Sequence, residues 1–131
     1  MTAHRVLVVD DNEMNVELAK FVLETDGFAV ESAVDAIEAL ERIPEFLPDL
    51  ILMDIQMPGM DGLELTRLLK ADPARKGILI VAFTAYAMRG DEARMRAAGC
   101  DGYLSKPIDA PTFAARVRSF LTNSDTAFGL P

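Results

Sequence analysis

Five short runs rich in Val, Ile and Leu alternate along the chain with stretches of helical periodicity. Strands that are separated by crossover helices pair in parallel, and the helices then cover both faces of the sheet. The pattern therefore predicts an α/β fold with a doubly wound parallel sheet. We expect strands near residues 5–10, 28–33, 49–54, 78–83 and 101–105, with helices between them.

Apolar periodicity also predicts which helix faces are buried. The side chains expected there are Leu18, Phe21 and Val22 of a helix over about 12–25, Ile37, Leu40 and Ile43 of a helix over about 36–43, and Leu65, Leu68 and Leu69 of the next helix. Asp11 or Asn12 is expected to cap the first helix, and Gly27 to end it. Pro44 and Pro48 are expected to bracket the connection that follows the second helix.

Composition sets limits on size and partners. A chain of 131 residues, half of them apolar, suits one domain, which we place at residues 1–121, followed by a short flexible tail at 122–131. The net charge of −8 argues against direct binding of nucleic acid or of an anionic membrane surface. No apolar run is long enough to span a bilayer, so we predict no membrane insertion and a cytoplasmic location. The single cysteine, Cys100, suits a reducing compartment and is expected to be a packing residue.

Acidic residues stand where two of the predicted strands end. Asp10 and Asp11 follow the first strand, and Asp54 follows the third. In a sheet of order 2-1-3-4-5, the binding crevice lies beyond the carboxyl ends of the first and third strands. Each acid alone suits a helix cap or a solvated surface position, but three together repel one another unless a cation neutralises them. Hard oxygen ligands favour Mg²⁺, with Mn²⁺ possible, over zinc.

Two further strand ends supply groups that bind anions. Thr84 follows the fourth strand and Lys106 the fifth. Taken singly, a threonine at a strand end is usually a β-former and a lysine is usually solvated. Together with a cation, however, a hydroxyl and an ammonium match the oxygens of a phosphoryl group that a carboxylate attacks in line.

These segments resemble the receiver domains of bacterial two-component response regulators. The resemblance covers residues 4–121 and is carried by Val8-Val9-Asp10-Asp11-Asn12, by the segment 49–62, and by Phe83-Thr84-Ala85, Ala98-Gly99-Cys100-Asp101-Gly102-Tyr103 and Leu104-Ser105-Lys106-Pro107-Ile108. It implies a flavodoxin-like (βα)5 fold with strand order 2-1-3-4-5. It further implies a regulatory phosphoprotein rather than an enzyme, whose only chemistry is self-catalysed phosphotransfer and slow autodephosphorylation.

The resemblance implies a role for each site residue. Asp54 would be the phosphoacceptor, while Asp11, Asp54 and the backbone carbonyl of Gln56 would bind Mg²⁺, with Asp10 acting through metal-bound water. Thr84 and Lys106 would bind the phosphoryl oxygens, and the peptide bond between Lys106 and Pro107 would be cis. Thr84 and Tyr103 would form the switch, although an ordinary half-buried aromatic is the simpler interpretation of Tyr103.

Partners are implied in the same way. A histidine kinase or histidine phosphotransfer protein would donate the phosphoryl group, docking near Asn15, Pro107 and Ile108, and a downstream protein would read the result, with the chain a monomer or weak dimer. The segment 84–91 resembles both hybrid-kinase receivers and single-domain cell-cycle regulators of alphaproteobacteria. It does not separate a stand-alone regulator from a hybrid-kinase receiver.

Three other functions compete with this interpretation. A flavin-binding module needs an uncharged phosphate-binding loop where this chain has Asp10-Asp11-Asn12-Glu13. A hydrolase with an aspartyl intermediate would place its nucleophile after the first strand rather than the third. An interaction adaptor that keeps the fold and ignores phosphorylation is the serious alternative.

Overall fold

The computed structural model describes residues 3–55, 61–84 and 89–122. Five parallel strands form one sheet in the order β2-β1-β3-β4-β5, as predicted. In chain order the elements are β1 (Arg5–Val9), α1 (Glu13–Thr25), β2 (Ala29–Ala33), α2 (Ala36–Phe46), β3 (Leu50–Met53), α3 (Gly62–Ala71), β4 (Leu79–Thr84), α4 (Arg89–Ala98), β5 (Gly102–Ser105) and α5 (Ala110–Thr122). The strand bounds agree with the predicted ones to within a residue at either end.

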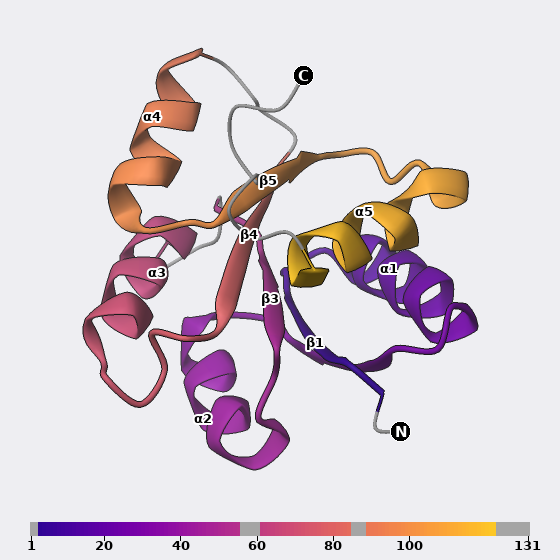
Figure 1. The fold of residues 1–131 in the computed structure, drawn as a ribbon, viewed down its shortest axis with the longest axis horizontal. Helices are drawn as coiled ribbons and strands as arrows, with labels where there is room; N and C mark the ends of the chain where they lie inside the picture. Colours follow the sequence, from indigo (N-terminus) through magenta and orange to yellow (C-terminus); the bar gives the residue numbers. More distant parts are fainter. Residues whose placement is uncertain (1–2, 56–60, 85–88, 123–131) are drawn as a thin grey trace.

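Helices lie on both sides of the sheet (Figure 1), with α1 and α5 on one face and α2, α3 and α4 on the other. Alternate residues of the central strands therefore enter separate cores. Val6 and Val8 of β1 pack toward α1 and α5, whereas Leu7 and Val9 pack toward the opposite helices. Burial on both faces explains why these strands are continuously apolar.

Three helices, α1, α2 and α3, expose residues that periodicity predicted to be buried. On α1, Leu18 and Phe21 are 43% and 69% exposed, and the buried residues are Ala19 and Leu23. The prediction was wrong because small residues such as Ala19 let the helix backbone approach the sheet, which leaves the larger apolar side chains on the outer flank.

The same holds for α2, where Ile37 is 73% exposed and Leu40 36% exposed, while Ile43 is buried as predicted. Pro44 lies inside this helix rather than ending it. The helix instead ends at Leu47, whose φ of 54° is left-handed. On α3, Leu68 is 48% exposed, which also contradicts the prediction.

Helix caps follow the sequence closely. Asn12, not Asp11, caps α1, since its side-chain oxygen accepts from the backbone N–H of Asn15 at 3.1 Å. Gly27 follows the end of α1 with a φ of +94°. Asp61 caps α3 by accepting from the backbone N–H of Glu64. Within the ranges the structure describes, no helix has the length and apolar character needed to cross a membrane.

Candidate phosphoacceptor and metal site

Backbone hydrogen bonds continue past the strand ends and fix the site residues in place. Asp10 N–H donates to the carbonyl of Ala33 at 3.0 Å, and Asp54 N–H donates to the carbonyl of Val9 at 2.9 Å. On the other side of the crevice, Lys106 N–H donates to the carbonyl of Thr84 at 2.8 Å. The first residue beyond each strand is thus held almost as firmly as the strand itself.

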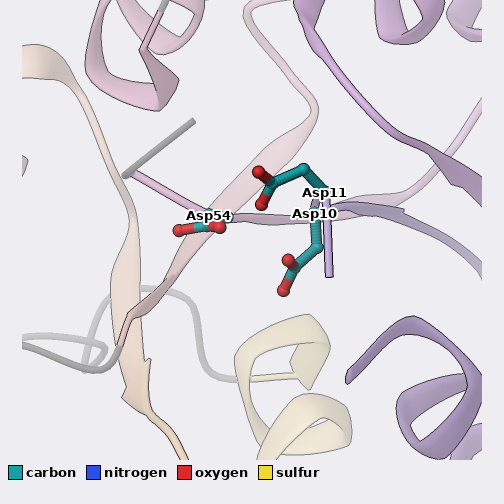
Figure 2. A group of neighbouring side chains, drawn as sticks. All are labelled: Asp10, Asp11 and Asp54. Atoms are coloured by element: carbon teal, nitrogen blue, oxygen red, sulfur yellow. The ribbon is translucent and has the colours of Figure 1, made fainter. Parts of the chain in front are cut away.

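The three acids meet at this edge of the sheet. One carboxylate oxygen from each of Asp10, Asp11 and Asp54 lies within 4.8 Å of the others, and Figure 2 shows the three carboxylates gathered together. Asp10 is fully buried, Asp54 is 5% exposed and Asp11 is exposed. The cluster therefore opens to solvent on the side of Asp11.

Asp10 uses its two oxygens differently. Its Oδ1 accepts from the backbone N–H of Asn12 at 2.8 Å, which turns the chain so that Asp11 follows at the rim. Its Oδ2 lies 2.9 Å from Nζ of Lys106 but outside hydrogen-bond geometry, and it has no hydrogen-bond partner within the described residues. A buried carboxylate oxygen paired only by charge has spare capacity to accept a further hydrogen bond, for example from a metal-bound water.

Lys106 is the cation that the structure places against this cluster. Its side chain is 13% exposed, and Nζ also lies 3.5 Å from Oδ2 of Asp54. Among the described residues, these three carboxylates and the Lys106 ammonium leave a local excess of two negative charges. Two unit charges 4.8 Å apart repel by about 3.5 kcal/mol at an effective dielectric constant of 20, so a divalent cation at this position would be strongly favoured. The all-oxygen donor set fits Mg²⁺.

The start of α3 packs directly on the backbone of the proposed phosphoacceptor. A Cβ added to Gly62 would collide with the carbonyl oxygen of Asp54 and lie 2.8 Å from Cα of Ile55. Thr66, which is fully buried, donates from Oγ1 to the carbonyl of Gly62 at 2.7 Å. The absence of a side chain at Gly62 is thus what permits this close contact.

The remaining residues predicted for the site lie as follows. Thr84 is the last residue of β4 and is fully buried. Tyr103 of β5 is half-buried and packs against the core formed with α2, α3 and α4. Gln56 lies outside the described residues.

The three residues predicted to dock the donor have different surroundings. Pro107 is exposed and follows a cis peptide bond, Ile108 packs partly against the core under α1 and α5, and Asn15 lies in the first turn of α1. They are therefore in accessible or partly accessible positions near the end of the sheet that carries the acids.

Residues 6–118 match the family model of the response regulator receiver domain. The chain belongs to this family. Receiver domains are the regulatory components of two-component signalling, so membership establishes the class of molecule and the fold together.

Relatives span nearly the whole receiver domain. This chain is 45% identical over 116 residues to the polar-differentiation response regulator DivK of Brucella anthropi, and the match covers 88% of this chain and 94% of DivK. A crystal structure of a putative response regulator from Chloroflexus aurantiacus superposes with a TM-score of 0.87 at 31% identity, covering 93% and 100% of the two chains. The receiver domain of a histidine kinase from Syntrophus aciditrophicus gives 0.83 at 29% identity, covering 98% of each.

The structure gives two residues of this receiver domain a role at the site that the sequence analysis did not assign. Gly62 contacts the backbone of Asp54, and the ring of Phe83 lies beneath the ammonium of Lys106 at 5.0 Å. A signal for Phe83 was available, because strand alternation places Phe83, Leu104 and Lys106 toward the same face of the sheet. The sequence carries no comparable signal for Gly62, since a glycine beside a helix cap is also an ordinary loop residue.

Proposed function

We propose that this receiver domain is a phosphoacceptor switch in which Asp54 accepts a phosphoryl group in the presence of Mg²⁺. The single observation that carries the proposal is the juxtaposition of three carboxylates and one ammonium at the ends of β1, β3 and β5. The receiver unit would span residues 1–121; the described part of the chain continues through Thr122, the last residue of α5, and the rest of the predicted tail, 123–131, lies outside the described residues. We propose that the protein acts in the cytoplasm, the location predicted from its short apolar runs and compatible with its single cysteine, Cys100.

The metal would be held by Asp11, Asp54 and the backbone carbonyl of Gln56, with Asp10 binding through water. Asp10 suits the indirect role because its Oδ2 is buried and lacks a hydrogen-bond partner among the described residues. When bound, Mg²⁺ (or Mn²⁺) neutralises charge shared by the carboxylates and the incoming phosphoryl oxygens.

In the transfer step, a carboxylate oxygen of Asp54 attacks phosphorus in line with the bond to the donor. The P–N bond of a phosphohistidine breaks, and its electron pair returns to the imidazole nitrogen, so that an acyl phosphate forms on Asp54. The Lys106 ammonium, 3.5 Å from Asp54 Oδ2, and the Thr84 hydroxyl would then bind the phosphoryl oxygens. The Lys106 ammonium already lies beside Asp54, and a donor preorganised in this way stabilises developing charge without rearranging during the reaction.

The signal would follow from new hydrogen bonds to the phosphoryl group. Two hydrogen bonds to a charged group contribute roughly 1.5–3 kcal/mol each. Reversing a 1:99 population requires about 5.5 kcal/mol, so both bonds must form almost entirely in the active state. We propose that Thr84 moves toward the phosphoryl group and that Tyr103, half-buried here, turns inward with it.

Partners would be proteins rather than nucleic acid. A histidine kinase or histidine phosphotransfer protein would dock near Asn15, Pro107 and Ile108, and a downstream effector would recognise the phosphorylated state of a monomer or weak dimer.

Phosphorylation tests this function directly. We expect the protein, incubated with Mg²⁺ and acetyl phosphate, to gain one phosphoryl group by intact mass. Asp54→Asn, which keeps the shape of the side chain, should gain none, whereas Asp26→Asn, at an exposed position on the far end of α1, should behave as the wild type. An unmodified wild-type protein would favour the phosphorylation-independent adaptor, and a modified Asp54→Asn would place the phosphoacceptor elsewhere.

A further inference from the structure

The ammonium of Lys106 lies over the face of an aromatic ring. Nζ is 5.0 Å from the ring centroid of Phe83, within the range of a cation–π interaction. The Lys106 side chain is 13% exposed and Phe83 is fully buried, so little water competes for the ammonium on the side of the ring. Such interactions are strongest where the cation is desolvated.

The ring itself has little freedom to move. Phe83 pairs in register with Leu104 in the centre of the β4–β5 ladder. On α5, the ring of Phe113 packs against it with centroids 5.7 Å apart and planes tilted by 41°. Phe83 therefore forms a fixed floor beneath Lys106 rather than a side chain that adapts to it.

The same ammonium faces both buried acids of the site. It lies 2.9 Å from Oδ2 of Asp10 and 3.5 Å from Oδ2 of Asp54, without hydrogen-bond geometry to Asp10. A lysine side chain has several rotatable bonds and loses much rotamer freedom when it is held in one place. Since attraction to the two carboxylates is weakly directional, a further contact from a different side narrows the positions that Nζ can take.

We propose that Phe83 is a positioning residue, whose ring holds the ammonium of Lys106 where it binds the phosphoryl oxygens on Asp54. The proposal rests on the phosphoacceptor function proposed above. Phe83 touches none of the reacting atoms and acts through Lys106 alone. Weakening the negative face of the ring should therefore slow phosphorylation even when the shape of the core is kept.

A double-mutant cycle tests the dependence on Lys106. We expect Phe83→Leu to lower the rate of phosphorylation by acetyl phosphate by about 3- to 30-fold, the range that a cation–π interaction corresponds to. In a Lys106→Met background, where no ammonium remains, the same change should alter the rate by less than about twofold. An equal factor in both backgrounds would show that Phe83 acts through packing, and would overturn the proposal.

A change in ring electronics separates the charge effect from packing. Pentafluorophenylalanine at position 83 inverts the ring quadrupole at nearly constant shape and should slow phosphorylation as Phe83→Leu does. The same replacement at Phe113, whose ring packs on Phe83, is the matched control and should leave the rate within about twofold of the wild type. Equal rates for the two replaced proteins would contradict the proposal.

A third measurement needs no phosphodonor. In the wild-type protein, the methylene protons next to Nζ of Lys106 should show an upfield ring-current shift in NMR spectra, and this shift should disappear in Phe83→Leu but not in Phe113→Leu. Its absence from the wild type would refute the contact between Lys106 and Phe83. If the shift is present but no phosphoryl group is gained, the phosphoacceptor function fails and the positioning of Lys106 stands.

Discussion

Replacing Gly62 by alanine tests the contact between α3 and the backbone of Asp54. The added Cβ would overlap the carbonyl oxygen of Asp54 and lie 2.9 Å from its carbonyl carbon. Neither backbone segment can shift easily. Asp54 N–H donates a hydrogen bond to the carbonyl of Val9, and the carbonyl of Gly62 accepts one from the Thr66 hydroxyl. Gly62 has no left-handed φ, so the effect is one of space and not of backbone conformation.

The size of the effect follows from two opposing contributions. Overpacking a well-packed site costs about 1–3 kcal/mol. Alanine is a better helix former than glycine by up to about 1 kcal/mol in a helix interior, and by less at the first helical position. We therefore expect Gly62→Ala to lower the free energy of unfolding by about 1–2 kcal/mol, a sizeable part of the roughly 5–15 kcal/mol of a typical domain.

Urea denaturation followed by far-UV circular dichroism measures this difference. Gly77→Ala is the matched control, because a Cβ at Gly77 would have no atom within 4 Å, and its free energy of unfolding should change by no more than about 0.5 kcal/mol. Equal stabilities of the two alanine variants would refute the close packing of α3 on Asp54. A loss of Mg²⁺ affinity in Gly62→Ala, measured where both variants are folded, would show that the displaced backbone reaches the metal ligands.

Two further predictions concern positions away from the site. Leu47→Gly should raise the free energy of unfolding, measured by urea denaturation, by about 0.5–1 kcal/mol, because Leu47 is 62% exposed and its φ of 54° suits glycine. Leu68→Gly, inside α3, is the control and should lower it. A lower free energy of unfolding for Leu47→Gly would contradict the left-handed cap. Burial raises the pKa of the Cys100 thiol to about 11, from 9.0 for an exposed thiol. Between these values the unfolded chain loses the thiol proton before the folded chain does, so the stability that the protonated thiol contributes is complete below pH 9 and is lost as the pH rises toward 11. Cys100→Ala should remove this decline, and the native thiol should react with a disulfide reagent at pH 8 far more slowly than the unfolded one; equal rates would show that the thiol is accessible.

The sequence was enough to predict which residue types form the site and that they lie at the same edge of the sheet. Asp10, Asp54 and Lys106 each directly follow a strand, and parallel strands in the order 2-1-3-4-5, which the resemblance to receiver domains implied, bring these positions to one edge of the sheet. Cys100 was also predicted correctly as a buried packing residue. The roles of Asp54 in phosphorylation and of Tyr103 in switching stay predictions until they are measured.

Helix burial could not be predicted as well. Phe21 and Ile37 have the spacing of core residues and are mostly exposed, while alanines beside them face the sheet. Periodicity shows that a helix has an apolar face, but the width of that face and the part of it that neighbours cover depend on how closely the backbone approaches the sheet.

The sequence by itself determined that parallel strands alternate with helices and that acids follow the first and third strands, because apolar runs and helical periodicity are local patterns. The strand order 2-1-3-4-5 was an implication of the resemblance to receiver domains. Only the tertiary structure decided that Nζ of Lys106 lies 2.9 Å from Asp10 and over the ring of Phe83, and that α3 presses on Asp54 through Gly62. Those contacts join residues far apart in the chain, and their distances depend on side-chain packing, which no periodicity in the sequence records.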